Sequence, residues 1–133
     1  MDVYRLYRLL RDDENPSKNG ISAKATNAGK DLESHVAKGS WNWRSQYISC
    51  TSSLEMAVNF ASKRYKNGRY RIAFLDRDRI ESDESIELID ISDGGDFEND
   101  SARNFARYFK EVVVVGKIPK EYVSVCEFLR LTL

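Results

Sequence analysis

Runs of apolar and β-branched residues recur along the chain and predict six β-strands. The strongest run is Val112 to Val115, four consecutive valines that are typical of a strand covered on both faces. Glu111 stands where this strand begins, and Gly116 and Pro119 break the run and predict a turn. The other strands are expected at residues 3–10, 46–50, 69–75, 86–91 and 122–129.

Apolar residues at helical spacing predict a helix from about Leu54 to Lys66. Ser52 and Glu55 precede and open this segment with the spacing of a capping box. Asn67 and Gly68 then end it.

A second amphipathic segment is expected to be capped by Asp100 or Ser101 and to end at Phe109. A short helical turn is predicted at residues 31–36, and residues 12–20, 21–30 and 76–84 are expected to be polar or irregular connections. The last of these connections leaves room for a helical turn. Six strands with two or three helices, without strict alternation, predict a single α+β domain over residues 1–133 with a mixed or mostly antiparallel sheet.

Composition limits the classes of function. The chain has 133 residues, and its 21 acidic and 21 basic residues give no net charge. This balance argues against a dedicated nucleic-acid-binding protein, although it leaves room for a nucleic-acid substrate held by a local patch. One histidine and no Cys-x-x-Cys spacing argue against a zinc site.

Two cysteines favour free thiols, and the N-terminus has no signal-peptide core. No apolar run approaches the length of a membrane span, so we expect a cytoplasmic protein, with export by a leaderless route left open. Oligomeric state is not indicated by the sequence.

Two charged residues stand beside apolar strands. Period-two alternation places Arg8 on the same strand face as Leu6 and Leu10, where an arginine needs a partner; Asp90 is one candidate. Glu111 has two interpretations: it is a solvated residue at a strand edge, or it is a functional carboxyl group held in position by the strand.

The order of three segments then carries a resemblance. Tyr7-Arg8 comes early, Tyr47-Ile48-Ser49-Cys50-Thr51-Ser52 leads into a helix, and Glu111 opens the strand before Gly-x-Ile-Pro. This order resembles the ADP-ribosyltransferase superfamily, particularly its Arg–Ser–Glu branch. It is most similar to a group of small, mostly fungal domains assigned to that superfamily, over nearly the whole chain.

The resemblance implies roles for individual residues. Arg8 would bind the phosphates or the nicotinamide-side ribose of NAD, the co-substrate. Ser49 would brace the ribose and Glu111, and Glu111 would bind a ribose hydroxyl and stabilise the oxocarbenium-like transition state. Such a transition state suits a fixed carboxylate, and a diphosphate suits the planar guanidinium of arginine.

Further residues complete the candidate NAD site. Tyr47, Trp41 and Trp43 offer aromatic faces for the flat rings of NAD, and Thr51 and His35 match motif positions. For each, an ordinary role remains open: a serine or threonine before a helix is a common cap, tryptophans pack loops, and a lone histidine often anchors a loop.

Two departures from the family pattern bear on activity. The central Ser-Thr-Ser appears as Ser49-Cys50-Thr51, so Cys50 removes one hydroxyl. Members that modify arginine usually carry Glu or Gln two residues before the catalytic Glu, where this chain has Phe109. Cys50 is also expected to be a partly exposed thiol near a helix N-terminus, where it is a candidate for reactivity, but no accompanying base is indicated.

The resemblance implies transfer of ADP-ribose from NAD to a protein or nucleic-acid acceptor, with release of nicotinamide. One alternative is an NAD glycohydrolase or an NAD-using RNA phosphotransferase. Another is a catalytically silent module of the same fold that binds a nucleotide or a protein. No metal ion and no membrane are expected to take part.

Overall fold

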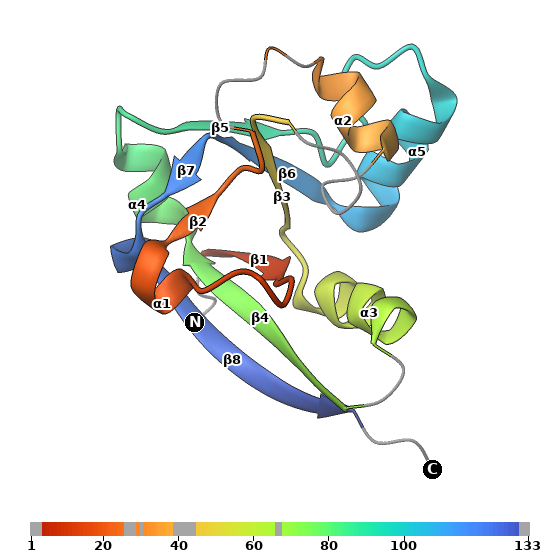
Figure 1. Ribbon diagram of the computed structural model, residues 1–133. Helices are drawn as coiled ribbons and strands as arrows, with labels where there is room; N and C mark the ends of the chain where they lie inside the picture. Colours follow the sequence, from red (N-terminus) through yellow and green to blue (C-terminus); the bar gives the residue numbers. More distant parts are fainter. Residues whose placement is uncertain (1–3, 26–28, 30, 39–44, 66–67, 131–133) are drawn as a thin grey trace.

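A computed structural model describes residues 4–25, 29, 31–38, 45–65 and 68–130. Its centre is a six-stranded antiparallel sheet with the order β5-β6-β3-β1-β4-β8 (Figure 1). The strands are β1 (Arg5–Leu9), β3 (Tyr47–Thr51), β4 (Gly68–Asp76), β5 (Glu87–Asp90), β6 (Glu111–Val115) and β8 (Val123–Arg130). The six predicted strands and the α+β class are confirmed.

A second, two-stranded sheet was not expected. It pairs β2 (Ile21–Ser22) with β7 (Lys117–Ile118), where irregular chain and a turn were predicted. Two-residue strands carry no periodicity for a sequence to reveal. Gly20 makes the approach possible, because its φ is 68° and a Cβ there would lie 2.3 Å from the Ile118 carbonyl oxygen.

The helices include one in a segment for which no helix was expected. They are α1 (Pro16–Asn19), α2 (Leu32–Lys38), α3 (Leu54–Arg64), α4 (Arg77–Ser82), α5 (Asp100–Phe109) and the 3-10 turn η1 (Lys120–Tyr122). The predictions of α2, α3 and α5 are confirmed. The helical turn allowed within residues 76–84 is α4, whereas α1 lies in a segment expected to be a loop. Pro16 opens α1, and Asp76 caps α4, which buries Ile80 against the core. None of the described helices is long and apolar enough to cross a bilayer.

The caps of α3 and α5 lie one residue from the predicted positions. Ser53, not Ser52, accepts a hydrogen bond from the Met56 amide at 3.2 Å. Asn99, rather than Asp100 or Ser101, caps α5 by accepting from the Ala102 amide at 2.9 Å. Neighbouring residues of similar capping preference explain the shift.

Replacing Ser53 with alanine is expected to lower the free energy of unfolding by about 1 kcal/mol, because one helix N–H loses its acceptor. Urea titration measures the change. Ser52→Ala is the matched control, since Ser52 is exposed and makes no capping bond in the described part of the chain. An equal loss in both variants would contradict the observed cap.

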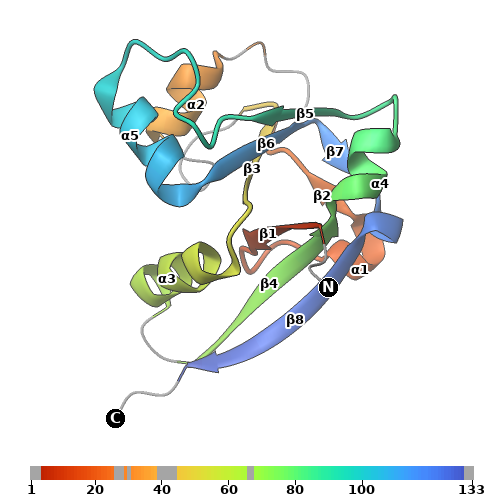
Figure 2. The ribbon, with the colours of Figure 1, turned by 180° about the vertical axis from the view of Figure 1, so that it is seen from behind.

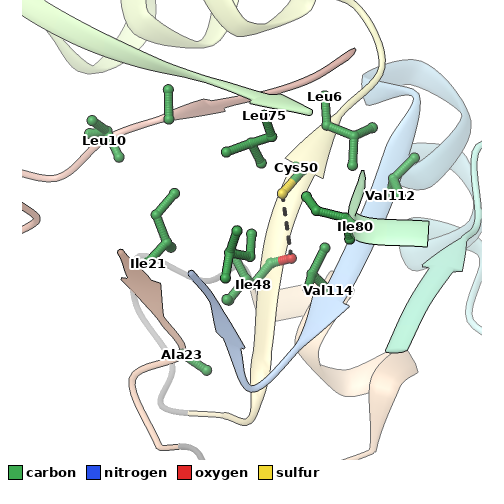
Figure 3. Packing of buried hydrophobic residues seen from close by; sticks show 12 residues of the cluster. Leu6, Leu10, Ile21, Ala23, Ile48, Cys50, Leu75, Ile80, Val112 and Val114 are labelled. Carbon is green, nitrogen blue, oxygen red and sulfur yellow. Dashed lines mark hydrogen bonds between the residues drawn. The ribbon is translucent and has the colours of Figure 1, made fainter. Parts of the chain in front are cut away.

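The main core lies between the two sheets and α4 (Figure 3). It contains Leu6, Leu10, Ile48, Cys50, Val112 and Val114, among others. The opposite face of β6 is also covered, because Val113 packs with Ala102 and Ala106 of α5. The prediction that the four-valine strand is covered on both faces is therefore confirmed at its centre.

The large sheet divides between β1 and β3. These strands pair only at Tyr7 and Thr51, whereas the neighbouring pairs run for four to eight residues. From that point β3 runs away from β1, as both views show (Figures 1 and 2). Side chains from β1 can therefore reach backbone atoms of β3 that no neighbouring strand uses.

Candidate functional site

Glu111 lies at the start of a central strand and is 1% exposed. β6 runs between β5 and β3, and Glu111 is paired with Thr51. Lys110 creates the sharp junction with α5: its φ of 54° is left-handed, and its amide donates to the last turn of the helix. The interpretation of Glu111 as a solvated edge residue is wrong.

Burial raises the pKa of Glu111 from 4.5 to about 8, against the lowering effects of a Ser49 hydrogen bond and the positive charge of Arg8. Glu111 is therefore protonated at neutral pH. Its Oε2 is buried and has no hydrogen-bond partner among the described residues. A buried, unsatisfied carboxyl oxygen with a raised pKa is typical of a functional site.

Arg8 is 4% exposed and shares its strand face with Leu6 and Leu10, as predicted. Its carboxylate partner is Glu14, not Asp90. Arg8 Nε and Nη2 donate to the two Glu14 carboxylate oxygens at 3.2 and 3.3 Å, and Nη1 donates to the Ser49 carbonyl at 2.8 Å. The guanidinium thus connects β1 to β3, the strand that carries Ser49.

Glu14 was not identified from the sequence. It lies in an acidic run that resembles a solvated loop, yet its side chain is 7% exposed. It accepts the Arg11 amide at 2.9 Å in addition to the Arg8 guanidinium. The one available signal was the need of Arg8 for a partner. Asp90 is instead engaged by Arg77 at 3.0 Å.

His35 is fully buried and joins two serines. Its Nδ1 is 2.6 Å from Ser45 Oγ, and its Nε2 is 2.8 Å from Ser49 Oγ. Burial, reinforced by the charge of Arg8, lowers its pKa to about 4, so the ring is neutral at pH 7. Ser45 was missed, because a serine beside the tryptophan loop carries no distinguishing pattern.

The contacts form a chain from Ser45 through His35 and Ser49 to Glu111. Ser49 has one hydroxyl proton, so the protonation of Glu111 sets the direction of donation. Ionised Glu111 accepts from Ser49, which then accepts from His35 Nε2–H. Protonated Glu111 can instead donate to Ser49, which is then free to donate to an unprotonated Nε2. Titration of Glu111 therefore gives the His35 ring access to its second tautomer.

These pKa shifts predict how stability depends on pH. A pKa raised from 4.5 to about 8 means that the Glu111 contribution is complete below pH 4.5 and is lost as pH rises to 8. The lowered pKa of His35 acts oppositely, between pH 6.5 and 4. Between pH 6.5 and 8 the Glu111 effect dominates, and the free energy of unfolding should fall by about 1 kcal/mol.

Urea titrations at pH 6.5 and 8 measure this loss, and Glu111→Gln should remove most of it. The groups that act on Glu111 are Arg8 and Ser49, with His35 and Cys50 nearby in the same buried cluster. A wild-type slope that persists in Glu111→Gln would assign the titration to another group.

The other predicted NAD-site residues have local contacts. Thr51 Oγ1 donates to the Phe109 carbonyl at 2.5 Å and accepts the Ser53 amide at 3.1 Å, which ties the strand-to-helix turn to α5. The Tyr47 ring packs 5.3 Å from that of His35. Trp41 and Trp43 lie outside the described residues.

Cys50 is buried in the main core rather than partly exposed. Burial raises the pKa of its thiol to about 12, so it is not a nucleophile at neutral pH. Cys50 and Cys126 are both free. Within the described ranges, no cluster of His, Cys, Asp or Glu is placed to hold a metal ion.

A groove of about 430 Å³ lies on the other face of β1. It is lined by residues of β1, β4, α4, η1 and β8, including Arg5, Phe74 and Tyr122. None of the predicted site residues borders it. Arg8, Ser49 and Glu111 do converge, but on a buried cluster rather than on this groove.

The sequence model of a family described as "Domain of unknown function (DUF7587)" matches residues 5–130. No curated protein sequence matches the chain.

Several solved structures are similar to the chain over most of its length. EcPltA matches with a TM-score of 0.66 and 22% identity over 94% of this chain and 75% of its own. An arginine-to-lysine mutant of heat-labile enterotoxin matches with a TM-score of 0.62 and 16% identity, over 93% of this chain and 67% of the enterotoxin chain. Full-length CARDS toxin matches with a TM-score of 0.59 and 15% identity over 94% of this chain, although this chain spans only 24% of the toxin. The fold is therefore that of the ADP-ribosyltransferase-like toxins.

Proposed function

The chain belongs to the DUF7587 family, and from its fold and buried site we propose that it is an NAD-dependent ADP-ribosyltransferase. Toxins of the ADP-ribosyltransferase-like fold support the general class. At these low identities they do not supply the activity or the acceptor, which therefore rest on the residues of this chain.

One observation carries the proposal. Arg8, Ser49 and Glu111 come from three separate strands and meet in one buried cluster, in which a Glu111 oxygen has no partner among the described residues. A buried polar atom without a hydrogen bond costs free energy in a purely structural role. The cluster therefore fits a site that completes its hydrogen bonds with a ligand.

In the proposed reaction the bond between ribose C1′ and the nicotinamide nitrogen breaks, and its electron pair leaves with nicotinamide. Positive charge develops on the ribose, where ionised Glu111 stabilises it. An acceptor nucleophile then bonds to C1′ and releases a proton. Ser49 orients Glu111, and neutral His35 holds Ser49.

Arg8 is proposed to bind the diphosphate of NAD, because its planar guanidinium suits phosphate oxygens. Arg8 and Glu111 are 4% and 1% exposed, so access of NAD requires the covering segments to move. Glu14 already pairs with Arg8. A diphosphate bound to Arg8 would therefore also be repelled by the negative charge of Glu14.

The acceptor is proposed to be a protein or nucleic-acid group other than arginine. Phe109 occupies the position at which arginine-modifying members carry Glu or Gln, and its ring stacks on Phe105 at 5.4 Å instead of offering a carboxyl or amide. Water as the acceptor would make the protein an NAD glycohydrolase. An RNA phosphate as the acceptor would make it a phosphotransferase if the P–O bond to the RNA then broke, which would leave the phosphate on ADP-ribose and return a hydroxyl to the RNA.

A catalytically silent nucleotide-binding module is the second candidate. Protonated Glu111 and the substituted Ser49-Cys50-Thr51 turn favour it. NAD and ADP-ribose would then raise the melting temperature of the protein without turnover.

Incubation with NAD labelled in its adenylate half tests the proposal. Label recovered on a protein or oligonucleotide indicates a transferase, and free ADP-ribose indicates a hydrolase. Intact NAD together with a thermal shift indicates the silent module. Arg8→Lys should weaken NAD binding in every case, because lysine lacks the planar fork.

A further inference from the structure

An aromatic and basic surface lies beside the proposed site, where α3 meets α5. Both views place α3 below α5 on the same side of β3 (Figures 1 and 2). We call it the α3–α5 surface. It consists of Phe60, Lys63, Phe105, Tyr108, Phe109 and Lys110.

The rings of this surface form a connected array. Phe109 packs 5.5 Å from Phe60 of α3 and 5.4 Å from Phe105 of α5. Lys63 Nζ lies 5.8 Å from the Tyr108 ring centre. The two helices therefore present one continuous face rather than two separate ones.

Two rings of the array are exposed. Tyr108 is 57% and Phe105 37% exposed, two of the four large hydrophobic residues that are exposed in the described part of the chain. Phe60 and Phe109 are partly buried beneath them, and the Arg64 guanidinium lies 5.2 Å from the Phe60 ring centre. Lys63 and Lys110 are exposed beside the rings, and neither forms an ion pair with a described carboxylate. The accessible groups of the surface are thus the Tyr108 and Phe105 rings and the two lysines.

The surface lies next to the backbone at which the Glu111 strand begins. Phe109 accepts the Thr51 hydroxyl through its carbonyl, Thr51 is paired with Glu111, and Lys110 is the residue between Phe109 and Glu111. The Glu111 carboxyl itself is buried, so the acceptor role requires the site to open towards this surface.

We infer that the α3–α5 surface binds single-stranded nucleic acid and presents it as the acceptor. Each nucleotide supplies a flat ring for the aromatic side chains and a phosphate for the lysines. An acidic protein segment would satisfy the lysines but would leave the rings exposed. The inference that the surface binds nucleic acid depends only on the residues of this surface, whereas the acceptor role also rests on the proposed function.

Fluorescence anisotropy with a labelled oligouridylate of roughly 12 nucleotides tests the binding. Tyr108→Ala should weaken binding at least about fivefold, because one stacking ring is lost, and Tyr108→Phe should retain it. Tyr4→Ala, which removes an exposed tyrosine outside the surface, should change nothing.

Salt dependence tests the basic part of the surface. Changing Lys63 and Lys110 together to alanine should reduce the magnitude of the slope of log K against log salt by about 1.4, since two phosphate contacts are lost. Lys117→Ala, an exposed lysine on β7, is the control. An unchanged slope would remove these lysines from the interface.

Three results would overturn the inference. The first is no binding of oligouridylate, and the second is an equal loss of affinity in Tyr4→Ala and Tyr108→Ala. The third is competition by polyglutamate as effective as that by unlabelled oligouridylate, which would assign the surface to acidic proteins. Incubation of the bound oligonucleotide with NAD separates the two proposals. Binding without labelling keeps the surface and counts against the acceptor role, and nicotinamide release without oligonucleotide binding keeps the enzyme and removes this acceptor.

Discussion

Glu111→Gln is expected to lower the rate of nicotinamide release from NAD by at least about 100-fold. Glutamine has the shape of the protonated side chain but cannot become the anion that stabilises positive charge on the ribose. The fold should survive, because Glu111 is itself neutral when buried at neutral pH. Initial rates at saturating NAD measure the effect.

The pH profile gives the same prediction a second test. If ionised Glu111 is the active form, kcat/KM should rise with pH towards a plateau above the pKa of about 8. Glu87→Gln, on the neighbouring strand β5, removes an exposed carboxylate and should leave both rate and profile unchanged. A wild-type profile that is flat between pH 6 and 9 would show that Glu111 does not titrate in the rate-limiting step.

Glu14→Ala is expected to cost about 3–5 kcal/mol of unfolding free energy. The change leaves the Arg8 guanidinium buried without its carboxylate and removes the acceptor of the Arg11 amide. Urea titration measures the loss. Asp13→Ala is the control in the same loop: that carboxylate is 75% exposed, and its removal should cost less than about 1 kcal/mol.

A double variant then separates charge from packing. Arg8→Met with Glu14→Leu removes both charges and should recover a substantial part of the lost stability, although NAD binding should remain lost. A double variant as unstable as the sum of the two single changes would mean that Arg8 and Glu14 do not interact energetically.

The strands and the long helices follow from features that the sequence contains in full. Four valines, period-two alternation and helical spacing of alanines are local patterns, and each produced an element near its predicted place. The caps moved by one residue because adjacent serines, or an asparagine beside an aspartate, have nearly the same capping preference. The β2–β7 pair was missed because two-residue strands have no period.

The site was predictable only in part. Arg8, Ser49 and Glu111 were singled out by their order, and they lie together. Glu14 and Ser45 were missed because their roles come from contacts with buried side chains of other elements, Arg8 of β1 and His35 of α2, and not from a local pattern. Cys50 was misjudged because exposure depends on which strand face meets the core, and here that face is the buried one.

The proposed function requires the buried Arg8–Ser49–Glu111 cluster to cleave NAD. The most direct measurement is the release of nicotinamide from NAD at pH 8.5 by the wild-type protein and by Glu111→Gln and Glu87→Gln, with and without single-stranded RNA. We predict release by the wild type and by Glu87→Gln, and at least about 100-fold less by Glu111→Gln. Release that is absent under all conditions, or that persists undiminished in Glu111→Gln, would contradict the claim.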